Sequence, residues 1–226
     1  MFEAASSVVG TVCNAIDRLI NHEYQRAFIP IAGLHHARRH IAAGFCVFND
    51  CGVAIEYLRH KYKIQRIAYV DIDAHHGDGV FYSFEHDPEL IFADLHEDGR
   101  FLYPGTGAAA ETGKGEAQGT KLNSPMPPQA NDDDFIKAWS SLEKLLLQYP
   151  VDFILLQCGA DSIKGDPITH MEYSEKAHAH AAKRLCEIAN EMCEGKLIAM
   201  GGGGYNHDNI AKAWTAVVRS MAQTPY

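Results

Sequence analysis

Acidic and imidazole side chains crowd residues 67–79, which read IAYVDIDAHHGDG. The stretch begins as an apolar run. A strand places alternate residues on one face, so Asp71, Asp73 and His75 leave it on the same side. One carboxylate and one imidazole of this set can share a divalent cation, and the third group can hydrogen-bond a neighbour. The pattern predicts a metal-dependent hydrolytic site at the C-terminal end of a buried strand.

A further carboxylate, Asp161, follows the most apolar stretch of the chain, residues 151–158. An Asp-x-His pair alone is more often a hydrogen-bonded pair than a metal site, but Asp161 strengthens the second interpretation. Two carboxylates and one imidazole suit a catalytic divalent site that keeps a position open for water. We therefore predict Asp73, His75 and Asp161 as ligands of Zn²⁺, with Fe²⁺ or Mn²⁺ as alternatives.

Tandem histidines, His35 and His36, follow another predicted strand at residues 26–31. Paired histidines are usually accidental. At the rim of a metal site, however, one imidazole can take a proton from water while the other holds a proton for a leaving group. Each imidazole needs a carboxylate to orient its far nitrogen, and Asp71 and Asp78 are the acids available for that role.

Tyr205 follows four glycines at positions 201–204, directly after the last predicted strand. It is either a packing residue in a tight turn or a phenol that donates to a developing oxyanion, with the glycines letting the backbone approach a substrate. Phe45 and Tyr103 stand in glycine-containing loops. They are either loop anchors or the walls of a narrow apolar channel.

Strands and helices alternate along the chain, which favours an α/β fold with three α/β/α layers around a mostly parallel sheet of about six strands. Ligands of such sheets bind outside the carboxyl ends of the strands, which is where the polar groups above fall. His178 and His180, on a predicted helix, are expected at the surface. The expected strands lie at 26–31, 67–71, 89–95, 121–126, 151–158 and 196–200, and the expected helices at 2–21, 50–62, 79–85, 131–148, 174–193 and 206–221.

Composition narrows the class of protein. The 226 residues, 46% of them hydrophobic, are enough for one domain, 1–226. A net charge of −9 with scattered Lys and Arg argues against nucleic-acid binding but leaves a basic substrate open. No apolar run approaches the roughly 20 residues of a membrane span. Six cysteines without a C-x-x-C pair predict free thiols and a cytoplasmic location.

Five ordered motifs of the chain resemble the zinc-dependent histone deacetylase family of the arginase/deacetylase superfamily. The motifs are GLHHARR…AAGFCVFND, VDIDAHHGDG, YPGTG, QCGADS…GDP and GGGGYN. This family includes bacterial acetoin-utilisation and acetylpolyamine amidohydrolase relatives, and the acid in HHGDG resembles the class I version. Family members begin well before the first helix predicted here. The resemblance therefore implies a catalytic domain that lacks the usual N-terminal segment, with association into a homo-oligomer or reduced stability as a consequence.

The resemblance also implies roles for individual residues. Zinc is held by the predicted triad, the two histidines form the acid/base pair with their two acids, and Tyr205 polarises the acetyl carbonyl. A channel for the acyl-lysine side chain is flanked by Gly44, Phe45 and Tyr103, with Ile168 at its mouth. A structural K⁺ ion would use oxygens of Asp71, Asp73, His75, Asp94 and Leu95, although many relatives carry Ser where Asp94 stands.

The expected activity is that of a metal-dependent amidohydrolase that removes acetyl groups from Nε-acetyl-lysine in proteins or peptides. An acetylpolyamine or another small acetylated amide is the alternative substrate. A different class of function, a non-catalytic deacetylase-like domain that binds metal or a partner, also stays open.

Overall fold

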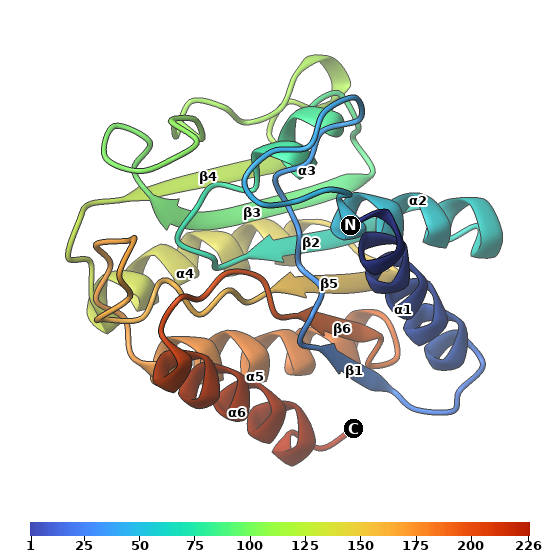
Figure 1. Cartoon of the computed structure of the whole chain (residues 1–226). Coiled ribbons are helices and arrows are strands. Elements are labelled where there is room, and N and C mark those ends of the chain that lie inside the picture. Colours follow the sequence, from blue (N-terminus) through green and yellow to red (C-terminus); the bar gives the residue numbers. More distant parts are fainter.

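Six parallel strands form one sheet in the computed structural model, which describes all residues 1–226 (Figure 1). The strand order is β1-β6-β5-β2-β3-β4, and every neighbouring pair runs in the same direction. The predicted fold class and number of strands are therefore confirmed. The strands are β1 (Arg26–Ile29), β2 (Ile67–Asp71), β3 (Leu90–Glu97), β4 (Lys121–Met126), β5 (Phe153–Gln157) and β6 (Leu197–Met200).

Helices cover both faces of the sheet and create two separate cores (Figure 1). One core joins one face of the strands to three early helices, through residues such as Ile16, Leu58 and Phe81. The other core joins the opposite face to three later helices, through Trp139, Leu185 and others. The helices are α1 (Phe2–Ile20), α2 (Asp50–Tyr62), α3 (Asp78–Ser83), α4 (Asp132–Gln148), α5 (Glu175–Met192) and α6 (His207–Gln223), with a short 3-10 turn, η1 (Gly115–Ala117).

Alternation along each strand explains why both cores are apolar. In β2, Tyr69 contributes to the first core, whereas Ala68 and Val70 contribute to the second. A strand buried on both faces needs apolar residues at successive positions, which is the pattern that predicted it. No helix combines the length and the hydropathy that crossing a membrane requires.

The polar segments meet where the strand order reverses. From β2 the chain builds outward through β3 and β4, and then returns to the other side of β2 to form β5 and β6. The carboxyl ends of β2 and β5 therefore flank a topological switch point, the usual place for a ligand in such sheets. Register places Asp71 opposite Gln157 at this point, so the residues that follow both strands enter one crevice.

One strand is longer than its sequence predicts. The apolar stretch ends at Leu95, but β3 continues to Glu97 because His96 and Glu97 still pair with β4. Both polar side chains are buried. The predicted loop thus begins later, and His96 and Glu97 become part of the sheet.

A buried ammonium group secures the start of β4. Lys121 is 2% exposed, and its Nζ donates to the carbonyl oxygens of Asp87 and Leu90 and to Oγ1 of Thr120. Asp87 precedes β3, Leu90 is its first residue, and Thr120 is the residue before β4. A cation in this place supplies hydrogen-bond donors to oxygens of three segments that meet below the sheet surface.

Lys121→Met should lower the free energy of unfolding by about 1–3 kcal/mol, because the apolar stem is kept while the buried oxygens lose their donor. Urea denaturation measures the loss. The matched control is Lys137→Met, which removes a lysine whose side chain is 78% exposed, and it should leave stability nearly unchanged. Equal effects of the two substitutions would contradict the role given to Lys121.

Candidate active site

Three buried side chains form a cluster that can hold a metal ion. One ligand atom each from Asp73, His75 and Asp161 lies within 4.8 Å of the others. His75 Nδ1 is 3.1 Å from Oδ1 of Asp73 and 3.0 Å from Oδ2 of Asp161. Two atoms that each lie about 2.0–2.2 Å from one tetrahedral ion stand about 3.3–3.6 Å apart. A shift of a few tenths of an ångström would admit an ion among them.

Electrostatics also favours a cation at this cluster. Burial opposes a charge on His75, but the carboxylates of Asp161 and Asp73 outweigh it and raise its pKa to about 11. Burial and the nearby charge of Asp73 raise the pKa of Asp161 to about 6. In the metal-free protein, the proton on His75 therefore supplies the positive charge that two buried carboxylates require. A divalent cation would meet the same requirement, so the residues fit the predicted metal.

Neighbouring groups aim the two carboxylates. Oδ2 of Asp73 accepts from Nε2 of Gln157 at 2.8 Å and from the backbone N–H of Gly203 at 2.9 Å. Oδ1 of Asp161 accepts from the N–H of Ala74 at 2.9 Å. These bonds fix the orientation of both carboxylates. Oδ1 of Asp73 also accepts from the backbone N–H of His75, at 2.9 Å, so an ion would share this oxygen with that donor. Sequence reasoning missed Gln157, since a glutamine that ends a strand gives no signal by itself.

The tandem histidines each have a carboxylate of their own. Nδ1 of His35 lies 2.8 Å from Oδ2 of Asp71, and Nδ1 of His36 lies 2.7 Å from Oδ1 of Asp78. The two Nε2 atoms face each other at 3.1 Å. Because both Nδ1–H groups donate to carboxylates, the facing Nε2 atoms share a single proton. Asp71 and Asp78 are the two acids that the sequence offered for this role.

The two imidazoles differ in basicity. Burial opposes a charge on His35, but the carboxylates of Asp71 and Asp73 raise its pKa to about 10. Burial and the charge on His35 lower the pKa of His36 below its ordinary value. At neutral pH, His35 is therefore protonated, and its Nε2–H faces the unprotonated Nε2 of His36.

The segment that carries these histidines has no regular structure of its own and is held by the first turn of α2. Asp50 is fully buried, and its Oδ1 accepts from the backbone N–H groups of Gly33 and Leu34, each at 3.0 Å. Two of the backbone donors just before the histidines are fixed in this way.

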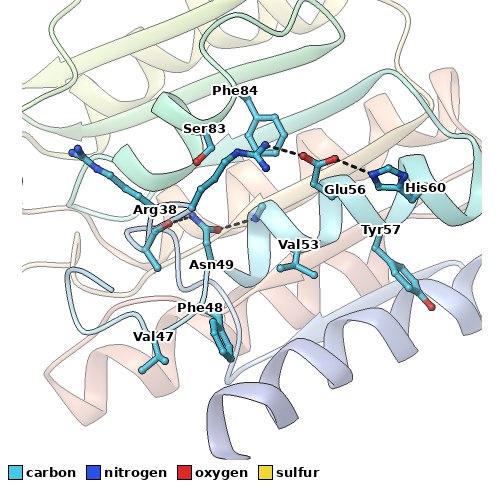
Figure 2. Close-up of a pocket in the computed structure, with 13 residues that line it drawn as sticks. Arg38, Val47, Phe48, Asn49, Val53, Glu56, Tyr57, His60, Ser83 and Phe84 are labelled. Atoms are coloured by element: carbon cyan, nitrogen blue, oxygen red, sulfur yellow. Dashed lines mark hydrogen bonds and ion pairs between the residues drawn. The ribbon is translucent and has the colours of Figure 1, made fainter. Parts of the chain in front are cut away.

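Asn49 holds the same segment from its carbonyl side. Its Nδ2 donates to the carbonyl oxygens of His35 and Ala37, at 3.1 and 2.9 Å. Its Oδ1 caps α2 by accepting from Gly52 N–H, and Figure 2 shows the side chain between the helix and the segment. One side chain thus ties the helix to the acid/base pair. Sequence reasoning missed it, although an Asn before a helix is a recognisable cap.

A cavity of about 430 Å³ opens on the outer side of Asn49 (Figure 2). Its walls come from α2, from the loop before α2 and from Ser83 and Phe84 near α3. The Arg39–Glu56 ion pair crosses it, at 2.8 Å. None of the predicted metal ligands or acid/base residues lines this cavity, so it is separate from the site.

Aromatic side chains stand at the mouth of the site. The ring centroids of Phe45 and Tyr205 are 6.2 Å apart, and those of His36 and Tyr103 are 5.1 Å apart. All three aromatic side chains are substantially exposed, with Phe45 at 87%. Gly44 has φ of +52°, and a Cβ there would come within 2.2 Å of the His36 ring. Only glycine therefore fits between Phe45 and the histidine.

Of the residues predicted for K⁺, Asp73 and His75 belong to the metal cluster itself, and Asp94 is already engaged. Oδ1 of Asp94 pairs with Nδ1 of His96 at 2.7 Å, and its Oδ2 accepts from Gly77 N–H at 2.8 Å. Burial opposes a charge on His96, but Asp94 outweighs it and raises the pKa of the imidazole. The K⁺ site of Asp71, Asp73, His75, Asp94 and Leu95 stays a prediction.

His178 corrects a prediction. It was expected at the surface, but it is fully buried, and its Nε2 lies 2.7 Å from the carbonyl oxygen of Gly159. This contact braces the turn that leads from β5 to Asp161. The signal was available: His178 shares a helical stripe with Ala182, Leu185 and Ala189, all buried.

Comparison with known proteins agrees with this geometry. A family model described as "Histone deacetylase domain" matches residues 1–221. The chain belongs to the histone deacetylase domain family. It is 38% identical to the acetoin utilization protein AcuC of Bacillus subtilis over 99% of this chain, and 32% identical to AcuC of Staphylococcus xylosus over 98%.

A solved structure of the histone deacetylase family, titled "Crystal Structure of HDA15 HD domain", superposes with a TM-score of 0.86 at 27% identity and covers 97% of this chain. The match takes in 64% of that chain. The present chain spans 56% and 58% of the lengths of the two AcuC proteins. The arginase/deacetylase-like fold that the motifs implied is thereby confirmed.

Asn49→Ala should destabilise this histone deacetylase domain more than the loss of an ordinary helix cap. The matched control is Asn131→Ala, which removes the cap of α4 without releasing a carbonyl of the acid/base segment. The control should cost about 1 kcal/mol, and Asn49→Ala about 1–2 kcal/mol more, because two further hydrogen bonds are lost. Urea denaturation compares them, and equal losses would remove the case for a tie between α2 and the histidines.

Proposed function

We propose that residues 1–226 form one catalytic domain, a metal-dependent amidohydrolase that removes acetyl groups from Nε-acetyl-lysine in proteins or peptides. One observation carries the proposal: a buried two-carboxylate, one-imidazole cluster lies beside two histidines, each with its own carboxylate. Membership of the histone deacetylase family supports the same reaction. A metal site alone would not call for a second, independently oriented pair of proton carriers.

Asp73, His75 and Asp161 would hold the metal, with Zn²⁺ as the proposed ion and Fe²⁺ or Mn²⁺ as alternatives for an oxygen-rich set. When bound, such an ion supplies a Lewis acid for the amide carbonyl and lowers the pKa of a water molecule. The protein orients the two carboxylates through hydrogen bonds from Gln157, Gly203 and Ala74.

The histidine pair moves protons in the proposed reaction. The unprotonated Nε2 of His36 takes a proton from the attacking water, and Asp78 stabilises the imidazolium that forms. The pair then returns a proton to the departing amine. The contact between the two Nε2 atoms, at 3.1 Å, lets either imidazole hold that proton.

Tyr205 would stabilise the oxyanion. Burial and the negative charges of Asp161 and Asp73 raise its pKa above the ordinary value. Its hydroxyl therefore remains protonated and can donate as negative charge develops on the acyl oxygen. Its ring packs near Phe45 at the mouth, so the tyrosine also forms part of the wall past which a substrate enters.

An acetylated side chain fits the proposed entrance. Phe45, Tyr103 and Gly44 flank it and Ile168 stands at its rim, so the stem of an acyl-lysine would pass between aromatic rings. A small acetylated amine remains the alternative substrate, because it carries the same amide. All six cysteines are free, which supports the further proposal of a reducing, cytoplasmic compartment. Association into a homo-oligomer stays a prediction.

Turnover by the zinc-loaded chain tests the proposal directly. Release of acetate from an acetyl-lysine peptide is compared with release from acetylputrescine. Faster cleavage of the peptide supports the lysine assignment, and faster cleavage of acetylputrescine assigns the small amine. If neither substrate is cleaved, the chain is not a deacetylase, and a metal-binding domain without turnover is left.

His36→Ala and Asp161→Ala should distinguish the role of the proposed base from that of a proposed metal ligand. The first should lower kcat by about 10²–10⁴-fold while metal content is unchanged, because the base is lost and the ligands remain. The second should lose the metal together with activity. His60→Ala, which removes a histidine with a side chain 84% exposed, serves as the control. Metal analysis by mass spectrometry decides the point, and full zinc occupancy in Asp161→Ala would contradict the ligand assignment.

The pH dependence of kcat/KM should reflect His36. Only its neutral form can accept a proton, and burial together with the charge on His35 lowers its pKa. The midpoint of the acid limb of the profile should therefore lie below the ordinary histidine pKa of about 6.5, so that activity persists to lower pH. Rates are measured with metal content checked at each pH. An acid limb above that value would show that another group is the base.

A further inference from the structure

A carboxylate outside the predicted site joins its catalytic tyrosine to the wall of its entrance. Asp166 lies in the loop after β5 and is 7% exposed. Its Oδ2 accepts from the backbone N–H of Tyr205 at 2.8 Å, and its Oδ1 accepts from the N–H of Ile168 at 3.0 Å. Both oxygens are thus used, and each holds a residue that the proposed function places against the substrate.

Tyr205 needs such a restraint because the segment before it is irregular. Residues 201–204 are glycines, and Gly204 has φ of +142°, a conformation that side-chain-bearing residues rarely adopt. Glycine backbones are conformationally permissive, so the position of Tyr205 depends on contacts from outside the segment. Asp73 provides one such contact at Gly203, and Asp166 provides the next at Tyr205 itself.

Other contacts already attach the Asp166 loop to the start of α6. Nδ2 of Asn206 donates to the carbonyl oxygen of Gly165 at 3.1 Å, and Nδ2 of Asn209 donates to those of Ile163 and Lys164, each at 3.2 Å. These bonds do not involve the Asp166 carboxylate. The loop therefore stays in place when Asp166 is replaced, and what is lost is the hold on Tyr205 and Ile168.

We propose that Asp166 is a positioning residue of the reaction, which acts through the Tyr205 backbone to place its hydroxyl and through Ile168 to set the width of the entrance. This inference rests on the proposed deacetylase function. Misplacement of a reacting group by about 1 Å costs on the order of 100-fold in rate. Asp166→Ala should lower kcat/KM for an acetyl-lysine peptide by about 10- to 100-fold. Asp166→Asn, which keeps one acceptor oxygen, should have a smaller effect.

A double-mutant cycle with Tyr205→Phe tests whether Asp166 acts through the tyrosine. If it does, Asp166→Ala should lower kcat/KM by no more than about 3-fold in the Tyr205→Phe background, because the hydroxyl it positions is already absent. Glu172→Ala is the matched control: it removes an acid of the same loop that pairs with exposed Lys164, and it should leave activity within about 2-fold. Metal content of Asp166→Ala should match that of the wild type, and thermal unfolding should show that the variant is fully folded at the assay temperature.

Amide hydrogen exchange provides a readout that does not depend on turnover. The Tyr205 amide should exchange at least about 10-fold faster in Asp166→Ala, while the Gly203 amide, held by Asp73, should be unchanged. An equal loss of activity in both backgrounds, or an unchanged Tyr205 amide, would overturn the inference. If the wild type is active and Asp166→Ala is equally active, the role of Asp166 is overturned and the proposed function stands. If the wild type is inactive, the proposed function and the role of Asp166 are both overturned.

Discussion

Two carboxylates buried side by side set the conditions for the rest of this structure. Asp73 and Asp161 are almost fully buried, follow neighbouring strands and enter one crevice. Burying two like charges is costly unless a cation or donors oppose them. The chain provides donors to one oxygen of each carboxylate and a protonated imidazole, His75, in the place where a metal ion would bring positive charge. The site is thus built for a cation before any substrate is considered.

Asp71 links this cluster to the acid/base pair. One of its oxygens accepts from the N–H of Asp73, and the other lies 2.8 Å from Nδ1 of His35 and 2.6 Å from the hydroxyl of Tyr69. Asp71, the last residue of β2, therefore fixes the turn that carries Asp73. It also fixes which ring nitrogen of His35 donates to a carboxylate. The proposed metal site and the proposed acid/base pair are therefore joined through a single side chain.

Irregular segments carry most of the chemistry, and regular elements hold them. The histidine segment is fixed by Asn49 and Asp50 at the start of α2, and the tyrosine segment is fixed by Asp73 and Asp166. In each case a side chain bonds to the backbone of a remote segment. This arrangement lets glycines and histidines occupy the crevice, where a helix or strand would not fit, without leaving their positions loose.

The sequence by itself determined the order of strands and helices and the main candidate residues, because apolar runs and polar side chains at strand ends are local signals. It also offered Asp71 and Asp78 as the acids for the two histidines. Only the tertiary structure decided the strand order, the burial of His178 and the roles of Asn49, Asp50, Gln157 and Asp166. The physical reason is that these side chains act on backbone groups of segments far along the chain. A backbone N–H or carbonyl is the same at every residue, so its partner becomes visible only when the chain is folded.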